Sequence, residues 1–199
     1  LLDDETKEVF YGIDALVVII GQRCPFVRVL GRKEPINRIL KKIYNFISYN
    51  RKVIVAHKTA PGTVDCTPSF NVFYRVMFMA VFLCFNTIML FPVYYELITR
   101  SPLFSISLNE FHLAHAALVT INCVLATGLS RTGALEYLGQ VNMLALITNL
   151  LLVPLILLNK WLFHSGVLNY IYFSFLTLFI IKEYFRRMYY AGVTKWHKR

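Results

Sequence analysis

The chain has 199 residues, of which 57% are hydrophobic and only 16% charged, and its formal net charge is +10. This composition excludes a disordered chain, a small disulfide-rich secreted domain and a typical soluble enzyme. Its 16 Phe, 12 Tyr and 2 Trp residues suit a protein that meets lipid. Because the chain starts at Leu1 without an initiator Met, we expect it to be a processed or partial product.

The first predicted elements are the strands of a β-hairpin. Residues 1–2 have the pattern of a strand end, residues 3–6 form a polar turn and residues 7–11 form a second short strand. Gly12 breaks this strand. A lone hairpin is marginally stable, so we expect further strands to come from a partner or from sequence upstream of Leu1.

Three helices are predicted after the hairpin. Residues 13–21 place apolar side chains on one helical face and Asp14 near the N-terminus, where the helix dipole favours an acid. A short helix is predicted between Pro25 and Gly31, and a longer one from Glu34 onward, with a proline in its first turn.

The third helix is amphipathic. Its apolar stripe contains Ile36, Ile39, Leu40, Ile43, Phe46 and Ile47, and its basic side contains Arg38, Lys41 and Lys42. Such a helix covers a sheet or lies on an anionic membrane surface, and the preceding hairpin favours the sheet. We therefore predict a partial α/β domain at residues 1–58. The polar stretch 48–68 leads toward the membrane, with the linker proper at 59–73.

Four uncharged windows of 20 to 22 residues then follow, at positions 76–95, 111–130, 137–158 and 161–181. About 20 apolar residues suffice for a helix to cross the hydrocarbon core of a bilayer. We predict a four-helix transmembrane bundle over residues 74–182 and a basic tail over residues 183–199, which makes the fold class a mainly α membrane protein. Tyrosines and tryptophans near the span ends, Tyr137 among them, are expected to form interfacial belts.

The distribution of charge predicts the topology. Lys and Arg number eleven in residues 1–68 and six in residues 182–199, whereas each connection between spans holds one. An even number of spans places both termini on one side, and the positive-inside rule makes that side the cytoplasm of a cell inner membrane. Cys24 and Cys66 would then be reduced thiols, and Cys84 and Cys123 small apolar groups within the membrane.

Polar residues recur on one face of the second span. His112, His115 and Asn122 are spaced by three and seven residues, with Glu110 just before them. They could form a proton path, a quinone contact or a metal site, but two His residues supply only half of a metal site. We favour interfacial or packing roles, and we expect no metal or other cofactor. Nothing in the spans has the paired charges of an ion or substrate path.

The third span carries Asn142 and Asn149 on one face, which predicts hydrogen bonds between helices, joined by Asn86 of the first span. Pro92 and Pro154 are expected to kink or end their helices. Three glycines, Gly128, Gly133 and Gly139, would let helices approach closely around a short turn.

Five features of the first 71 residues carry a family resemblance: residues 8–16, the turn at Pro25, the basic helix, residues 46–52 (Phe-Ile-Ser-Tyr-Asn-Arg-Lys) and residues 66–71 (Cys-Thr-Pro-Ser-Phe-Asn). Together they resemble the C-terminal half of the DCC family of thiol-disulfide oxidoreductases, also called DUF393. The resemblance implies a thioredoxin-like domain followed by a membrane portion, as in membrane-anchored bacterial members. It covers about residues 1–75 and, less specifically, the hydrophobic remainder.

The sequence departs from this family at its catalytic motif. The family has an N-terminal Cys-Pro-x-Cys, in which a thiolate attacks a disulfide and a second cysteine resolves the mixed disulfide. Here no Cys-x-x-Cys exists, and Cys24-Pro25-Phe26-Val27 has Val in place of the second cysteine. Cys24 is thus only a weak candidate nucleophile, and we expect the motif to lie upstream of Leu1.

Two function classes follow. The first is a membrane-anchored thiol-disulfide oxidoreductase acting on protein disulfides, and the second is a non-catalytic subunit or docking protein of a larger membrane complex. A third hypothesis, a quinone-linked redox bundle, would need reactive cysteines at the outer face. Walker, dinucleotide-binding, Ser-His-Asp and zinc-finger patterns are missing, and no motif points to nucleic acid.

Overall fold

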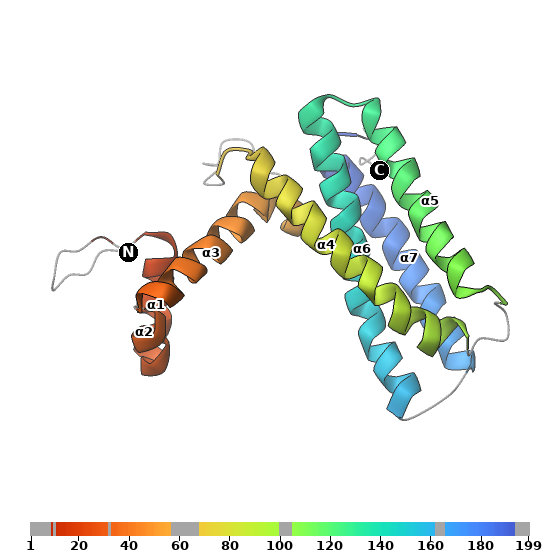
Figure 1. Ribbon diagram of the computed structural model, residues 1–199, viewed down its shortest axis with the longest axis horizontal. Coiled ribbons are helices and arrows are strands. Elements are labelled where there is room, and N and C mark those ends of the chain that lie inside the picture. The colour runs from red at the N-terminus through yellow and green to blue at the C-terminus, as the bar shows by residue number, and fades with distance from the viewer. Residues whose placement is uncertain are drawn as a thin grey trace. The chain divides into compact units, whose positions relative to one another are not determined.

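The computed structural model describes residues 9, 11–31, 33–56, 68–99, 105–161 and 166–193. These residues form seven α-helices and one π-helical segment (Figure 1): α1 (Gly12–Arg23), α2 (Pro25–Gly31), α3 (Glu34–Val55), α4 (Val72–Val93), η1 (Tyr94–Ile98), α5 (Leu108–Thr127), α6 (Arg131–Trp161) and α7 (Gly166–Tyr190). In this part of the chain the only β-structure is a single bridge residue, Val9. The predicted hairpin lies mostly outside the described residues, and the thioredoxin-like domain stays a prediction.

The chain divides into two compact units. The first comprises Leu1–Asn50 and Thr67–Phe70, and the second comprises Arg51–Cys66 and Asn71–Arg199. The last turn of α3 therefore belongs to the second unit, together with the four long helices.

In the first unit, α1 and α2 pack closely because glycines occupy their contact. A Cβ atom on Gly21 would lie 2.7 Å from Cβ of Arg28, and one on Gly31 would lie 2.8 Å from Val17 Cγ1. Val17 is buried in this contact. The predicted helices at 13–21 and between Pro25 and Gly31 are thus confirmed.

The third helix is also confirmed, but it is longer than expected. It continues without a break through residues 48–55, which the polar composition had assigned to the start of a linker. Of its predicted apolar stripe, Ile39, Ile43 and Ile47 are exposed. No described residue forms a sheet beneath them, so the choice between a sheet and a membrane surface stays open.

The carboxylate of Asp14 joins α1 to α3. Its Oδ1 accepts a hydrogen bond of 2.8 Å from Asn37 Nδ2, and its Oδ2 lies 3.1 Å from Lys41 Nζ. The hydrogen bond from Asn37, assisted by Lys41, lowers the pKa of Asp14 below its ordinary value. Because folding lowers the pKa of Asp14, this contact stabilises the packing of α1 against α3 at pH values above the ordinary aspartate pKa. The stabilisation is lost as the pH falls through the lowered pKa.

We expect Asn37→Leu to raise the pKa of Asp14 toward the ordinary aspartate value, because the strongest donor to the carboxylate is removed. Carboxyl-carbon NMR of the full chain in micelles measures this pKa. Asn45→Leu, an exposed amide on the same helix, is the matched control and should leave the titration unchanged. An unshifted Asp14 titration in Asn37→Leu would contradict the assigned contact.

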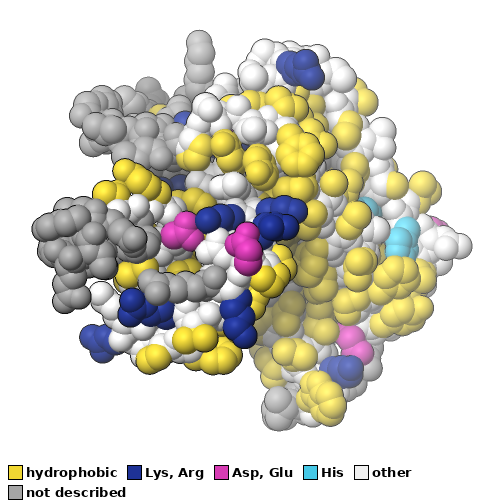
Figure 2. Space-filling model, turned by 60° about the vertical axis from the view of Figure 1, so that its left-hand side comes forward, with side chains coloured by type: hydrophobic (Ala, Val, Ile, Leu, Met, Phe, Trp, Pro, Cys, Tyr) yellow, Lys and Arg dark blue, Asp and Glu magenta, His cyan; other side chains and the backbone are white. Residues whose placement is uncertain are grey.

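The second unit contains four helices that are long and apolar enough to cross a bilayer: Val72–Ile98, Leu108–Thr127, Arg131–Trp161 and Gly166–Tyr190. Only 6% to 28% of each apolar window is buried within the protein. Hydrophobic side chains cover most of the visible bundle surface (Figure 2). A water-soluble protein would bury these groups, so the outward apolar surface indicates a lipid environment.

The number of spans is as predicted, but their bounds differ. Each of the four helices extends beyond its uncharged window at one end or both, because charged residues at the helix ends continue the helix. The second helix nevertheless ends at Thr127, before residue 130, and the fourth starts at Gly166 rather than at residue 161. The basic tail expected from residue 183 is helical through Tyr190, since α7 continues into it.

The long helix α6 lies at the centre of the bundle and contacts α4, α5 and α7. One end of the bundle is packed by apolar side chains from four elements: Val93, Leu97, Leu152, Leu155, Ile156 and Leu176. The α-helical geometry of α4 ends one residue after Pro92 and changes to the π-helical η1, whereas α6 passes through Pro154 without ending. The expectation for the prolines thus holds at the first position, and at the second the helix is not terminated.

Candidate functional site

Charged and amide side chains gather at the other end of the bundle, where α4 and α6 begin and α7 ends. They are Arg75, Glu136, Gln140, Glu183, Arg186 and Arg187. Arg75, Gln140 and Arg187 are each at most 2% exposed. Charged residues within membrane helices are costly unless they are paired, and they commonly mark functional positions.

Arg187 and Gln140 bind the C-terminal end of α3. Arg187 Nη1 donates to the carbonyl of Val53 at 2.7 Å and Nη2 to that of Ile54 at 3.3 Å. Gln140 Nε2 donates to the carbonyl of Lys52 at 3.3 Å. The last carbonyls of a helix have no partner within the helix, and Arg187 supplies one for Val53 and one for Ile54. Gln140 adds a second donor to the Lys52 carbonyl, which also accepts from the Ala56 backbone N–H at 3.1 Å.

A fourth carbonyl is held by Arg186. Its Nη1 donates to the carbonyl of Ala56 at 3.1 Å. Ala56 follows the last helical residue with φ of 48°, the left-handed conformation that often ends a helix, and its side chain is buried. The end of α3 is thus capped by side chains that are more than 80 residues away in the sequence.

Glu183 holds the two arginines in place. Its carboxylate accepts from Arg186 Nε at 2.7 Å and Nη2 at 2.5 Å, and it lies 2.8 Å from Arg187 Nε. Arg187 also donates to Gln140 Oε1 at 2.7 Å. One carboxylate beside two guanidinium groups leaves one positive charge, and the negative end of the α3 dipole faces it.

The second ion pair joins α4 to α6. Arg75 donates through both terminal nitrogens to the two carboxylate oxygens of Glu136, each at 3.1 Å. This two-point geometry adds both energy and directional specificity to the pair. A Cβ on Gly139 would lie 2.8 Å from Arg75 Nη1 and 3.3 Å from Val53 Cγ2, so this glycine provides the predicted close approach.

The sequence did not predict these ion pairs, which join α4 to α6 and hold the α7 arginines at the end of α3. Arg75, Glu136 and Glu183 border the uncharged windows, so a search for apolar runs places them outside the membrane helices. The position of these charged residues beside the apolar windows was the signal in the sequence that could have identified them as part of the site. Their pairing was not visible, because the partners are 61 residues apart in one case and, for Arg187 and Val53, 134 residues apart.

Asparagines in the middle of the bundle form the predicted interhelical hydrogen bonds. Asn86 Nδ2 donates to Asn142 Oδ1 at 2.9 Å, and Asn149 Nδ2 donates to Asn86 Oδ1 at the same distance. Asn142 Nδ2 in turn donates to the backbone carbonyl of Met79 at 2.9 Å. The network joins α4 to α6 at three points.

Asn86→Leu is expected to destabilise the bundle by about 1–2 kcal/mol, because Asn142 and Asn149 lose a partner that is hard to replace in hydrocarbon. The midpoint of SDS-induced unfolding in mixed micelles measures the loss. Thr120→Val is the control, because the Thr120 hydroxyl is exposed and bonds only within α5. Equal stability of the two variants would contradict a structural role for the network.

The two histidines proposed for a metal site have different partners in the structure. His112 Nδ1 lies 2.8 Å from the carbonyl of Leu108, and its ring packs against Phe91. His115 faces a cavity between α4, α5 and α6. Among the described residues, no group of three or more His, Cys, Asp or Glu side chains is placed to hold a metal ion.

Asn122, the third residue of that predicted face, accepts a hydrogen bond of 2.6 Å from the hydroxyl of Tyr137. Tyr137 is 3% exposed. It therefore packs inside the bundle and does not belong to an interfacial belt, because its hydroxyl finds a partner on α5.

The cysteines do not assemble into a redox pair in the described part of the chain. Cys24, Cys84 and Cys123 are free thiols with exposed positions, and Cys66 lies outside the described residues. Cys24 remains the weak nucleophile candidate that the sequence suggested.

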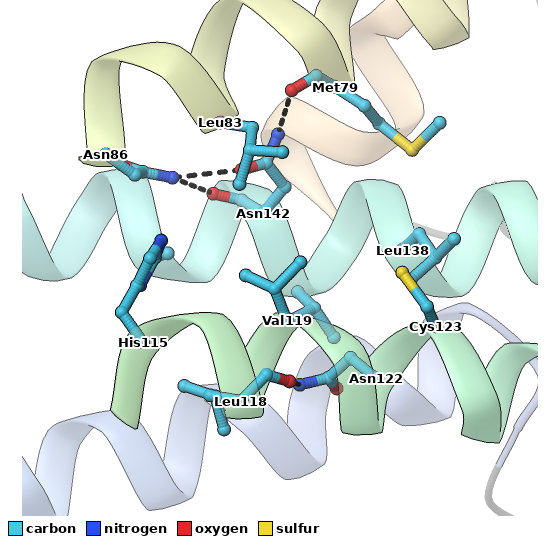
Figure 3. Close-up of a pocket in the computed structure, with 12 residues that line it drawn as sticks. Met79, Leu83, Asn86, His115, Leu118, Val119, Asn122, Cys123, Leu138 and Asn142 are labelled. Carbon is cyan, nitrogen blue, oxygen red and sulfur yellow. Dashed lines mark hydrogen bonds between the residues drawn. The ribbon is translucent and has the colours of Figure 1, made fainter. Parts of the chain in front are cut away.

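The cavity has a volume of about 280 Å³ and an almost entirely apolar lining. His115 and Val119 extend into it from α5, and Asn86 and Asn142 close one side (Figure 3). Nothing in the sequence pattern predicted this cavity, since it depends on how three helices pack.

Comparisons of this chain with protein-family models, with curated proteins and with solved structures each found no match. Two features of the structure bear on its function, the capped end of α3 and the interior of the bundle.

Proposed function

We propose that this chain is a membrane anchor, in which a four-helix bundle holds the end of α3 and thereby keeps the domain that contains α1–α3 at the bilayer. The observation that carries the proposal is the capping of α3 by Gln140, Arg186 and Arg187. A simple flexible tether needs no such contacts. Burying an arginine costs desolvation free energy. The use of buried arginines at the end of α3 therefore supports a role in holding that end.

The distribution of charge supports an orientation for this anchor. The bundle end that holds α3 carries Arg75, Arg131, Lys182, Arg186 and Arg187, whereas Lys160 is the basic residue that the structure describes at the opposite end. By the positive-inside rule, the held domain faces the cytoplasm of a cell inner membrane. In this arrangement the anchor is a subunit or docking protein of a larger membrane complex.

Limited trypsin digestion of inside-out membrane vesicles tests the anchor. We expect cleavage after Arg23 and Arg28 on the short helices α1 and α2. Arg51 and Lys52 should be protected although their side chains are equally exposed, because the end of their helix is held by α6 and α7. In Arg187→Leu, the sites at Arg51 and Lys52 should become cleavable at least ten-fold faster. Cleavage of the wild-type chain at Lys52 as fast as at Arg23 would contradict the proposal.

A single thiol tests the orientation. Cys24 is free and exposed, so a membrane-impermeant maleimide should label it in inside-out vesicles and not in intact cells. Labelling in intact cells would reverse the proposed topology while leaving the capping of α3 unaffected.

The second candidate function is a thiol-disulfide oxidoreductase of the DCC type, favoured by the resemblance of residues 46–52 and 66–71 to that family. Such an activity needs a Cys-Pro-x-Cys motif from outside these 199 residues, since the chain has no Cys-x-x-Cys. Both candidates share the anchor and differ in whether the held domain is catalytic.

An assay of dithiol-dependent reduction of a protein disulfide separates the two candidates, with the protein isolated from its native membranes. Activity that is lost on alkylation supports the oxidoreductase. Inactivity of a fully reduced, folded preparation supports the non-catalytic subunit.

A further inference from the structure

We propose that the cavity between α4, α5 and α6 binds a lipid-soluble molecule with a hydrocarbon body and a carbonyl oxygen, which enters from the bilayer and accepts a hydrogen bond from His115. The proposal is independent of the anchor function, since the cavity lies in the bundle interior and shares no residue with the capping of α3. Its evidence is the size, lining and depth of the cavity and the chemistry of one imidazole.

The size and lining favour a hydrocarbon occupant. Apolar cavities of ~150 Å³ already bind benzene, and this one measures about 280 Å³. Leu83, Leu118, Val141 and Ala145 supply much of its wall. The amide groups of Asn86 and Asn142 beside it are already hydrogen-bonded to each other, to Asn149 and to the Met79 carbonyl, so water would find few partners there.

The depth of the cavity favours entry from the bilayer. His115 lies seven residues from the start of α5, or roughly 10 Å along the helix axis. Leu83 and Leu118 are both exposed on the outer surface as well as lining the cavity. The cavity is partly open, and the surroundings of its lining helices are hydrocarbon, so a lipid-soluble molecule reaches it without crossing water.

His115 identifies the polar end of the ligand. Its Nε2 lies 3.5 Å from Thr87 Oγ1, while the Thr87 hydroxyl donates its own hydrogen to the carbonyl of Leu83 at 2.9 Å. In the imidazole tautomer that carries its hydrogen on Nε2, this nitrogen is a donor that faces the Thr87 oxygen, and we assign His115 this tautomer. A distance of 3.5 Å is well beyond the usual 2.9–3.0 Å, so a ligand carbonyl can form a shorter bond.

The thiol of Cys123 provides a built-in reporter, because it lines the cavity, and Cys84 is a matched control, because it is also free and exposed but lies on α4 away from the lining. The full chain in detergent micelles is treated with N-ethylmaleimide, and alkylation at each cysteine is followed by peptide mass spectrometry. The probes are 2-undecanone and undecane, which share a hydrocarbon chain and differ in the carbonyl.

We expect 2-undecanone to slow alkylation of Cys123 several-fold while leaving Cys84 unchanged. Undecane should need an about five-fold higher concentration for the same protection, the ratio expected for one net hydrogen bond. In His115→Leu the two probes should protect equally. In Ala145→Phe, which places a ring in the cavity and keeps His115, neither probe should protect.

Several outcomes would overturn the proposal. Equal slowing at Cys84 and Cys123 would mean general partition into the micelle. Equal potency of the two probes on the wild-type chain would show that neither the ligand carbonyl nor His115 contributes to binding. Continued protection in Ala145→Phe would place binding elsewhere, and this variant keeps the proposal testable if His115→Leu fails to fold.

Discussion

Arg187→Leu is expected to destabilise the second unit by about 3–5 kcal/mol, the usual result of removing one member of a buried, hydrogen-bonded charge cluster. The substitution leaves the carbonyls of Val53 and Ile54 and the amide oxygen of Gln140 without their guanidinium donor. It also removes one of the two cations beside Glu183. The unfolding midpoint in SDS mixed micelles measures the effect.

Two variants show whether the loss comes from geometry or from charge. Arg187→Lys keeps the positive charge, but its ammonium group lacks the planar arrangement of donors that binds two carbonyls and an amide oxygen at once. We therefore expect an intermediate loss of stability. Arg186→Leu should cost only about 1 kcal/mol, because the Arg186 side chain is 35% exposed and solvent screens its pairing. Stability of Arg187→Leu within about 0.5 kcal/mol of the wild type would show that the capping of α3 is energetically unimportant.

The four spans were predictable because a bilayer imposes a length of about 20 apolar residues, and such runs are visible in a single sequence. Their ends were not predictable from hydropathy. Arg75 and Glu136 stop an apolar window, yet a helix continues through them because its backbone hydrogen bonds do not depend on side-chain charge. The true helix ends depend on whether those charges find partners.

Within the bundle, too, some contacts were predictable from the sequence and others were not. The seven-residue spacing of Asn142 and Asn149 places them on one face, and only hydrogen bonds to a neighbouring helix make such a face tolerable in lipid. That local signal correctly predicted the asparagine network. The capping of α3 left no comparable signal, because residues 48–55 have a polar composition typical of a linker and their stabilising partners lie on α6 and α7.

The pair of Arg75 and Glu136 offers the clearest measurement of what a buried charge contributes in this bundle. Glu136→Leu is expected to cost about 3–5 kcal/mol, because it leaves a guanidinium that is only 2% exposed without its carboxylate. Arg75→Leu should cost less, about 2–3 kcal/mol, since the remaining Glu136 carboxylate is 25% exposed and can reach solvent.

Replacing both residues by Leu should recover most of the loss, because two apolar side chains need no partner, so the double variant is expected within about 1 kcal/mol of the wild type. The coupling energy from this double-mutant cycle, measured by SDS unfolding, should therefore reach at least 3 kcal/mol. Arg131→Leu, an exposed arginine at the start of the same helix α6, is the matched control and should change stability by less than about 0.5 kcal/mol. Additive losses would mean that the pair stabilises the bundle only through packing of the side chains and not through their charges.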